Sequence, residues 1–341
     1  MTPHQKKRAE ELWALRGGRI GGPGAFWLYN PFISECAEPM RLQMEQRASL
    51  PKALSELAML VTARHWSATY AWCRHAGQAI KAGLEEAEID ALGHGRQPHF
   101  AEAHANIVHT VAWQLLTTGR LESATQARAS AAFGLPAFVE LVSEVGYACI
   151  VSLANTTFEP DPPNNAPDYL APGPAPVAPE GAPMDGAANG TIGGATDSLI
   201  GAAARGWEHC PQIAACARHY DEVIRTRLAL PPTTVWTIIL MVARHWLARA
   251  DWPSLRRQAA AAGLDDATID ALARGVRPSL PDPVQATAYD FVAEMLTGGR
   301  AGDATFAKAH DILGFARMIE LPAIIGFVSM VSLVGNVFAE T

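Results

Sequence analysis

The chain has 341 residues, 49% of them hydrophobic, and a formal net charge of -7. An acidic chain whose longest basic run is Lys6-Lys7-Arg8 lacks the electrostatic footprint of a nucleic-acid-binding protein, so we expect no nucleic-acid partner. The five cysteines show no Cys-x-x-Cys or zinc-type spacing, which favours free thiols in a reducing, cytoplasmic compartment.

The elements expected along the chain are all helical. Residues 1–20 are charged and lack the apolar core of a secretory signal, so they predict a short helix or an arm. Apolar residues then recur at helical spacing, with prolines and glycines at the breaks. About six helices are predicted for this part, over 50–61, 69–82, 85–92, 102–117, 123–133 and 135–158, with a break near 66–68. No alternating β-branched run occurs, and the predicted fold class is all-α.

The same pattern returns at an offset of 180 residues. The sequence Ala-Arg-His-Trp at 63–66 recurs at 243–246, and the register holds without a gap. A period this long indicates a tandem domain duplication and not a solenoid. We predict a first domain over 21–158, an extended Pro/Gly/Ala-rich linker over 159–200 and a second domain over 201–341. Whether the two copies pair within one chain is left open.

One stretch raises the question of a membrane. Residues 321–339 carry no charge and approach the length that spans a bilayer. The counterpart in the first copy, 141–159, contains Glu144, and ionisable residues are rare within membrane spans. We therefore expect a buried core helix and no membrane partner.

Two polar residues are present in the first copy and replaced in the second. Glu56 and His75 lie on consecutive predicted helices, and an antiparallel hairpin would bring them together. A carboxylate beside an imidazole fixes its tautomer and raises its basicity, which suits general acid/base catalysis. The second copy has Trp236 and Leu255 at these positions. The alternative is a solvated glutamate and an ordinary core histidine.

Other candidates have weaker support. His65 and His245 precede a predicted helix break, where an imidazole would either cap the helix or bind substrate. Arg64 would clamp a carboxylate, although a helix end is the commoner place for such a residue. Histidines 94, 99, 104 and 109 are spaced by five, about 140° around a helix, so those at 99–109 share no face. We therefore expect no metal, and without a Gly-rich phosphate loop we expect no cofactor.

Short motifs across the first copy match a known family. They are Gly22-Pro23, Asn30-Pro31, Leu50-Pro51, Glu56-Leu57-Ala58-Met59-Leu60, Ala63-Arg64-His65-Trp66, Tyr70-Ala71-Trp72, His75, Ala79, Gly83-Leu84, Ile89 and Ser152 to Phe158. On these motifs each copy resembles the carboxymuconolactone decarboxylase family, in the superfamily that also contains alkylhydroperoxidase D-like proteins. The likeness extends over nearly the whole of both copies.

The resemblance implies a cofactor-independent lyase that decarboxylates a small, anionic lactone or unsaturated acid in a helical cleft. It implies that His75 is the general acid/base and that Glu56 orients it. Substrate-binding roles follow by the same resemblance for Tyr70, Trp72, Arg64 and His65, and for His245 and Asp251 from a degenerate second copy. Family members form rings, so we expect a homo-oligomer, with three two-domain chains forming a pseudo-hexamer that buries the apolar last helix.

The chain departs from the family at one position of interest. Family members usually read Tyr-Glu-Trp-x-x-His, whereas this chain has Ala71. The peroxidase branch has cysteines at 68 and 71, and because both are alanine here, thiol-based peroxide reduction is not expected. Two alternatives to a decarboxylase stay open. One is an isomerase or hydrolase acting on a related small molecule, and the other is a non-catalytic binding or assembly module.

Overall fold

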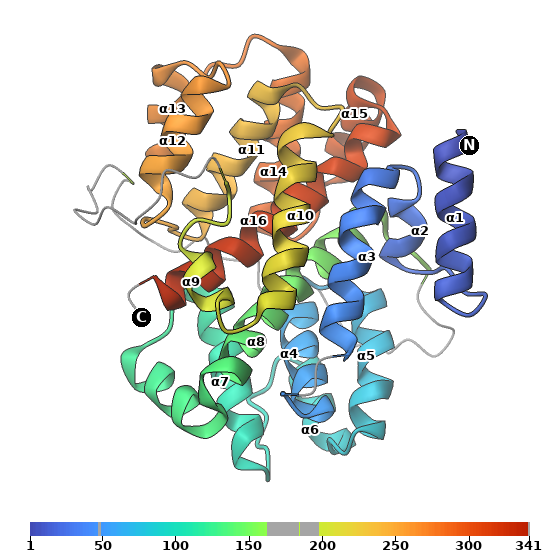
Figure 1. The fold of residues 1–341 in the computed structure, drawn as a ribbon, viewed down its shortest axis with the longest axis vertical. Helices are drawn as coiled ribbons and strands as arrows, with labels where there is room; N and C mark the ends of the chain where they lie inside the picture. The colour runs from blue at the N-terminus through green and yellow to red at the C-terminus, as the bar shows by residue number, and fades with distance from the viewer. Residues whose placement is uncertain (47–48, 162–183, 185–197, 340–341) are drawn as a thin grey trace.

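The computed structural model describes residues 1–46, 49–161, 184 and 198–339, which form sixteen α-helices and no β-strand (Figure 1). The all-α fold class is therefore confirmed. The helices are α1 (Pro3–Leu15), α2 (Pro23–Trp27), α3 (Pro31–Gln46), α4 (Lys52–His65), α5 (Thr69–Lys81), α6 (Glu86–Gly93), α7 (Ala103–Thr118), α8 (Ser123–Phe158), α9 (Ala203–Trp207), α10 (Pro211–Thr226), α11 (Pro232–His245), α12 (Trp252–Ala261), α13 (Asp266–Ala273), α14 (Pro283–Gly298), α15 (Asp303–Leu313) and α16 (Phe315–Phe338). Most of the predicted linker lies outside the described residues.

From α2 onward the helices come in pairs 180 residues apart. Helices α2, α3, α4 and α7 begin and end at offsets of 180 from α9, α10, α11 and α14. The predicted break after the Ala-Arg-His-Trp motif falls at Ser67 and Leu247, whose φ angles of 55° and 53° end α4 and α11. In α8 the break falls at Gly134, which has non-helical angles, and Gly314 separates α15 from α16 in the same way. We refer to α2–α8 as the first copy and to α9–α16 as the second.

The structure adds helices that the apolar pattern did not predict. These are α2 and α3, which stand ahead of α4. For residues 1–20, where the sequence predicted a short helix or an arm, the structure has a helix, α1, that begins with a capping box between Thr2 and Gln5. Helix α1 has little apolar periodicity and is held by polar contacts. Arg8 donates to the Ser34 hydroxyl at 3.0 Å and to the Ser34 carbonyl at 2.9 Å. In Figure 1 α1 lies at the outer edge of the molecule, beside α2 and α3.

The two copies pack against each other along their last helices. Helices α8 and α16 meet at two glycines, and an added Cβ would lie 2.6 Å from Met330 Cα at Gly146 and 2.5 Å from Ile150 Cα at Gly326. Only a residue without a side chain permits such an approach, and the contact is reciprocal because 146 and 326 are 180 apart. Helices α3 and α10 also pack together. The copies thus pair within one chain and share a continuous apolar core.

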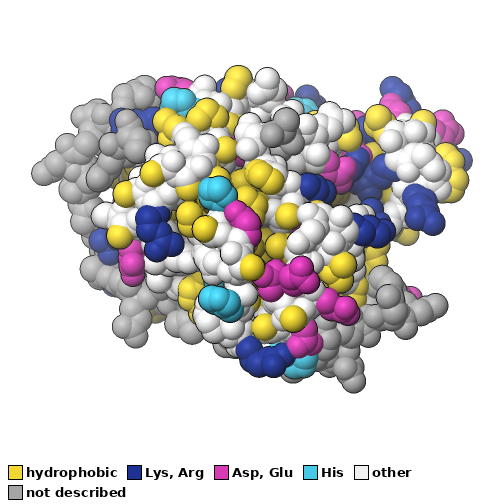
Figure 2. Space-filling view, turned by 90° about the horizontal axis from the view of Figure 1, so that it is seen from below, with side chains coloured by type: hydrophobic (Ala, Val, Ile, Leu, Met, Phe, Trp, Pro, Cys, Tyr) yellow, Lys and Arg dark blue, Asp and Glu magenta, His cyan; other side chains and the backbone are white. Residues whose placement is uncertain are grey.

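Helices α8 and α16 are long and apolar enough to cross a bilayer, and 94% of the most apolar window of each is buried within the chain. A core helix of a soluble protein has the same properties. The last helix is covered by the other copy, so its burial needs no second chain, contrary to the expectation that self-association would cover it. On the face shown in Figure 2, acidic, basic and apolar side chains are interspersed, without a continuous basic stripe.

Candidate functional site

A cavity of about 1000 Å³ lies in the N-terminal part of the chain. Its walls come from the end of α1, the loop that follows, and helices α2, α3, α4, α5 and α8. The Glu56 and His75 side chains both line it, as does Tyr70. Three of the predicted site residues are therefore brought together in one cavity of the first copy.

Glu56 and His75 form a close pair. His75 Nδ1 lies 2.6 Å from Glu56 Oε2, and Lys52 Nζ lies 2.6 Å from the other carboxylate oxygen. The Glu56 side chain is 2% exposed and that of His75 is 22% exposed. With the carboxylate at Nδ1, the other imidazole nitrogen, Nε2, has no hydrogen-bond partner among the described residues. It is the nitrogen that a ligand in the cavity would meet.

Local structure explains how the pair forms. The break at Ser67 turns the chain so that α5 packs back along α4, which places His75 against the start of α4. Lys52 and Glu56 are one turn apart on α4, the spacing at which a lysine and a glutamate meet. Ala71 and His75 have the same spacing on α5, so both lie on the face that lines the cavity.

The Glu56 carboxyl is held in its ionised form. Burial raises its pKa, but hydrogen bonds and charges from His75 and Lys52 outweigh this, and the net pKa lies below the usual value. At neutral pH Glu56 is therefore a carboxylate that accepts from the imidazole Nδ1–H and stabilises the imidazolium.

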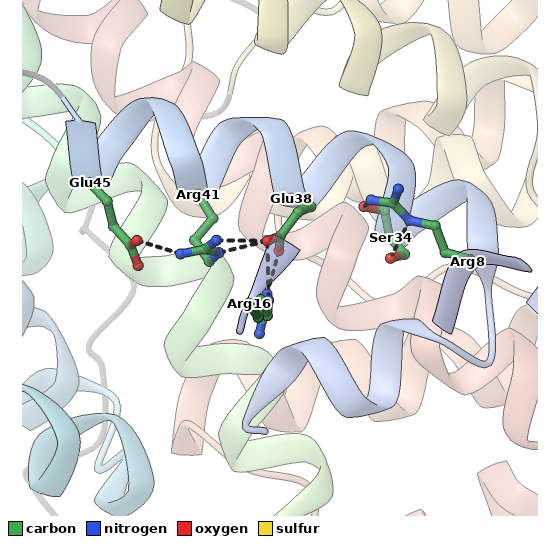
Figure 3. A network of polar contacts seen from close by, with 6 residues as sticks. All are labelled: Arg8, Arg16, Ser34, Glu38, Arg41 and Glu45. Atoms are coloured by element: carbon green, nitrogen blue, oxygen red, sulfur yellow. Dashed lines mark hydrogen bonds and ion pairs between the residues drawn. The ribbon is translucent and has the colours of Figure 1, made fainter. Parts of the chain in front are cut away.

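A second set of polar contacts builds the wall between α1 and α3 (Figure 3). Glu38, 2% exposed, accepts hydrogen bonds from both Arg16 and Arg41, and Arg41 also pairs with Glu45. Burial raises the Glu38 pKa, but the two guanidinium groups outweigh this effect, and the net pKa lies below its usual value. Arg16 and Arg41 thus line the cavity while their charge is partly balanced by Glu38.

Two further cations line the cavity without such a partner. Arg19, in the loop after α1, and Arg74, on α5, are exposed, and neither makes a hydrogen bond or ion pair with the residues that the structure describes. A guanidinium that is not already paired can bind a carboxylate through two parallel hydrogen bonds. The cavity entrance therefore suits an anionic ligand.

Deeper in the cavity, polar groups are buried without partners. Asn155 on α8 is 3% exposed and Trp27 on α2 is 2% exposed, and both line the cavity. The Asn155 amide nitrogen and oxygen and the Trp27 indole nitrogen find no hydrogen-bond partner within the described chain. Buried polar groups are nearly always paired in proteins, so these atoms indicate a place for a ligand or for water.

Two other predicted site residues face elsewhere. Arg64 Nε donates to the Gly93 carbonyl at the end of α6, at 2.9 Å, as Arg244 does to Ala273 in the second copy, at 3.0 Å. Trp72 is fully buried in the core. Neither Arg64 nor Trp72 lines the cavity, because the hairpin that joins Glu56 and His75 turns their side chains away from it.

The paired histidines lie near the contact between the copies. His65 and His245 each pack edge-on against the tryptophan that follows, with ring centroids 4.9 and 4.7 Å apart. Burial, assisted by the nearby His245, lowers the pKa of His65 to about 3, and burial with the charge of Arg244 lowers that of His245 to about 4. Both are therefore neutral at physiological pH, and neither lines the cavity.

Asp251 also lies apart from the cavity, within its own copy. It is 6% exposed and accepts a hydrogen bond from the Ala202 N–H at 2.7 Å. Burial raises its pKa to about 6, against the smaller opposing effect of that hydrogen bond. Within the described ranges, no group of three or more His, Cys, Asp or Glu side chains lies together as a metal site requires.

Several cavity residues were not predicted from the sequence. They are Arg16, Arg19, Trp27, Arg41, Lys52, Arg74, Glu144, Tyr147 and Asn155. The comparison of copies that singled out Glu56 and His75 also marks three of these. Glu144, Tyr147 and Asn155 of α8 correspond to Ile324, Phe327 and Gly335 of α16, so the polar side chains are confined to the first copy.

Comparisons with protein-family models, curated proteins and solved structures return no match. Evidence for a function therefore comes from the cavity and its residues.

Proposed function

We propose that the chain is a cofactor-independent lyase that decarboxylates a small unsaturated or lactone carboxylic acid. The observation that carries the proposal is the Glu56–His75 pair, 2.6 Å apart at the wall of a cavity of about 1000 Å³. A carboxylate, an oriented imidazole and a free second ring nitrogen are what proton transfer to or from a bound molecule requires.

In the proposed reaction the bond between the substrate carbon and its carboxylate breaks and carbon dioxide leaves. The electron pair of that bond moves into the conjugated carbonyl and forms an enolate. The His75 imidazolium then gives the proton at Nε2 to the carbon that lost the carboxylate. Glu56 stays ionised throughout, holding Nδ1–H and stabilising the imidazolium before the transfer.

The charges of the cavity support an anionic substrate. Arg19 and Arg74 line the cavity and have no ion-pair partner among the described residues. The other lining cations, Lys52, Arg16 and Arg41, are balanced by Glu56, Glu38 and Glu45. The volume lies at the upper end of the range for small-molecule sites. An isomerase that moves a double bond would use the same imidazole as base and then as acid, and the products formed distinguish the two reactions.

The experiment is to incubate the metal-stripped protein with a panel of lactone and unsaturated acids and to measure carbon dioxide release and product structure. We expect His75→Ala to lower turnover by about 10²- to 10⁴-fold, the usual contribution of a general acid/base. The matched control is His99→Ala, which removes an exposed histidine that does not line the cavity. Full turnover in His75→Ala would refute the mechanism, and binding without turnover would favour a binding module.

A further inference from the structure

We propose that the cavity contains a carboxylate-binding pocket beside Ala71, at the place where the second copy holds its own Asp251 carboxylate. The ligand carboxylate would take the position in the first copy that a side chain takes in the second. This inference deepens the proposed function and rests on it only for the statement that the bound carboxylate belongs to a substrate.

The second copy shows the surroundings of that carboxylate. Asp251 stands at the start of α12, accepts from the Ala202 N–H, and lies against two glycines. An added Cβ at Gly201 would come 1.9 Å from Asp251 Oδ1, and one at Gly335 would come 3.2 Å from Oδ2. The carboxylate is therefore enclosed by the loop before α9 and by the last turns of α16.

At the matching place the first copy has no carboxylate, and its loop takes another conformation, with φ and ψ of 56° and -143° at Gly22 against -63° and -27° at Ala202. The counterparts of Asp251, Ala202 and Gly335 are Ala71, Gly22 and Asn155, and all three line the cavity. The Gly22 N–H makes no hydrogen bond with the residues that the structure describes, whereas the Ala202 N–H donates to Asp251. Asn155 adds an amide, 3% exposed, where the second copy has no side chain.

The chemistry of these groups points to a carboxylate. The Gly22 N–H, the Asn155 amide nitrogen and the Trp27 indole nitrogen are donors that lack acceptors within the described chain. The Tyr70 hydroxyl oxygen lies beside the same loop, 3.2 Å from where a Gly21 Cβ would be. An ionised carboxylate offers only acceptors, on two oxygens, and is suited to several converging donors.

The position relative to His75 gives this pocket a role in the reaction. Ala71 precedes His75 by one helical turn, and residues at this spacing have neighbouring Cβ atoms on one face of the helix. A carboxylate above the Ala71 methyl group would lie beside the imidazole, so the carbon that bears it would face Nε2. The substrate class is then a small acid bound through its carboxylate at Ala71, with the remainder of the molecule toward Arg74 and Arg19.

The test uses acetate as probe and the melting temperature of the full-length protein as readout, at constant ionic strength maintained with chloride. Acetamide, which has the same shape without the charge, is the comparison. We expect acetate to raise the melting temperature and acetamide to have no effect. In Ala71→Asp, which supplies its own carboxylate, the apparent Kd for acetate should rise about tenfold or more. Ala87→Asp, an exposed substitution on α6, is the charge-matched control and should respond as the native protein does.

A second variant keeps the test decisive if Ala71→Asp fails to fold. Asn155→Ala removes one donor and should also weaken the acetate effect. Equal effects of acetate and acetamide, or an acetate effect that survives both Ala71→Asp and Asn155→Ala, would overturn the inference.

These measurements need no turnover, so they separate the pocket from the proposed reaction. His75→Ala should keep the acetate effect, with an apparent Kd within about twofold, while turnover is lost. Loss of the acetate specificity in the native protein would refute the pocket and leave the Glu56–His75 pair in place. Full turnover in His75→Ala with the acetate effect intact would refute the catalytic role and leave the pocket.

Discussion

The two copies have corresponding helices but differ in the region of the cavity. In the first copy, α4, α5 and α8 surround a polar cavity with Glu56 and His75 at its wall. In the second copy, the corresponding positions hold Trp236, Leu255 and Phe327, which are 8%, 4% and 0% exposed. Large apolar side chains thus stand where the first copy has Glu56, His75 and Tyr147. Packing of a duplicated fold does not require the cavity, so the polar side chains that line it call for another explanation, and ligand binding provides one.

The largest expected effect comes from giving the first copy the residue of the second. His75→Leu should lower turnover by about 10²- to 10⁴-fold because it removes the proposed general acid. The reciprocal change, Leu255→His, should give the second copy no activity, since Trp236 stands in place of Glu56. Steady-state rates of product formation measure both, and activity gained by a His75→Leu, Leu255→His double variant would contradict the assignment of the reaction to the first copy.

At this pair of positions only the second copy has a side chain that titrates, Asp251, and it should make the stability of the protein depend on pH. Burial raises the Asp251 pKa from 3.8 to about 6 in the folded protein. The stability associated with this group is therefore fully present below pH 3.8 and is lost as pH rises through about 6. Asn at 251 keeps the oxygen that accepts from Ala202 and does not titrate. Asp251→Asn should match the native protein near pH 3.8 and become more stable by about 3 kcal/mol above pH 6.

Urea unfolding at a series of pH values measures this difference, with Asp161→Asn, at an exposed position after α8, as a control. Unfolding curves that run parallel at every pH would mean that the Asp251 carboxyl is not held in its neutral form.

The contact between α8 and α16 should be equally sensitive in the two copies. Gly146→Ala and Gly326→Ala each place a Cβ within 2.6 Å of backbone on the other helix. We expect each to lower the free energy of unfolding by about 1–3 kcal/mol, because helices packed this closely must separate. Gly77→Ala on α5, where a Cβ meets nothing within 4 Å, is the control and should raise it by about 0.5–1 kcal/mol. A large effect at only one of the two glycines would show that the contact is not reciprocal.

The sequence predicted the helices that have apolar periodicity and the pair that differs between copies. Glu56 and His75 could be identified from the sequence because each is replaced by a large apolar residue at the matching position of the second copy. For residues 1–20 the sequence left a short helix and an arm as alternatives, because Arg8 and Arg16 hold α1 through contacts with distant residues rather than through an apolar face. Asn155 was missed because it lies in a helix whose overall hydropathy suggested only a core role.

Some residues that were predicted to bind substrate do not line the cavity, for a different reason. Arg64 and His65 recur in both copies, and recurrence marks what both copies need for packing: Arg64 binds the end of α6, and His65 packs against Trp66. Asp251 is present in only one copy, but its side chain is buried there and accepts a hydrogen bond from the Ala202 N–H. Spacing along a helix cannot say which side chain turns toward a cavity and which toward a neighbouring helix, since that depends on how the hairpins pack.

The smallest expected effect concerns a hydrogen bond that one copy makes and the other lacks. In the second copy Trp207 donates from its indole nitrogen to the Ser143 hydroxyl at 2.9 Å, across the contact between copies. Trp27 is the counterpart of Trp207, and the residue matching Ser143 is Ala323, which has no acceptor in its side chain. Ala323→Ser should therefore give Trp27 an acceptor and raise the free energy of unfolding by about 1 kcal/mol.

The same change should weaken acetate binding, because an indole N–H that donates to the introduced hydroxyl is no longer available in the cavity. Ser143→Ala is the reciprocal variant and should cost about 1–3 kcal/mol by leaving Trp207 buried and unpaired. Denaturant unfolding with and without acetate measures both consequences. If Ala323→Ser stabilises the protein and acetate binding is unchanged, Trp27 supports the fold alone, and the donors left for the ligand carboxylate are Gly22, Tyr70 and Asn155.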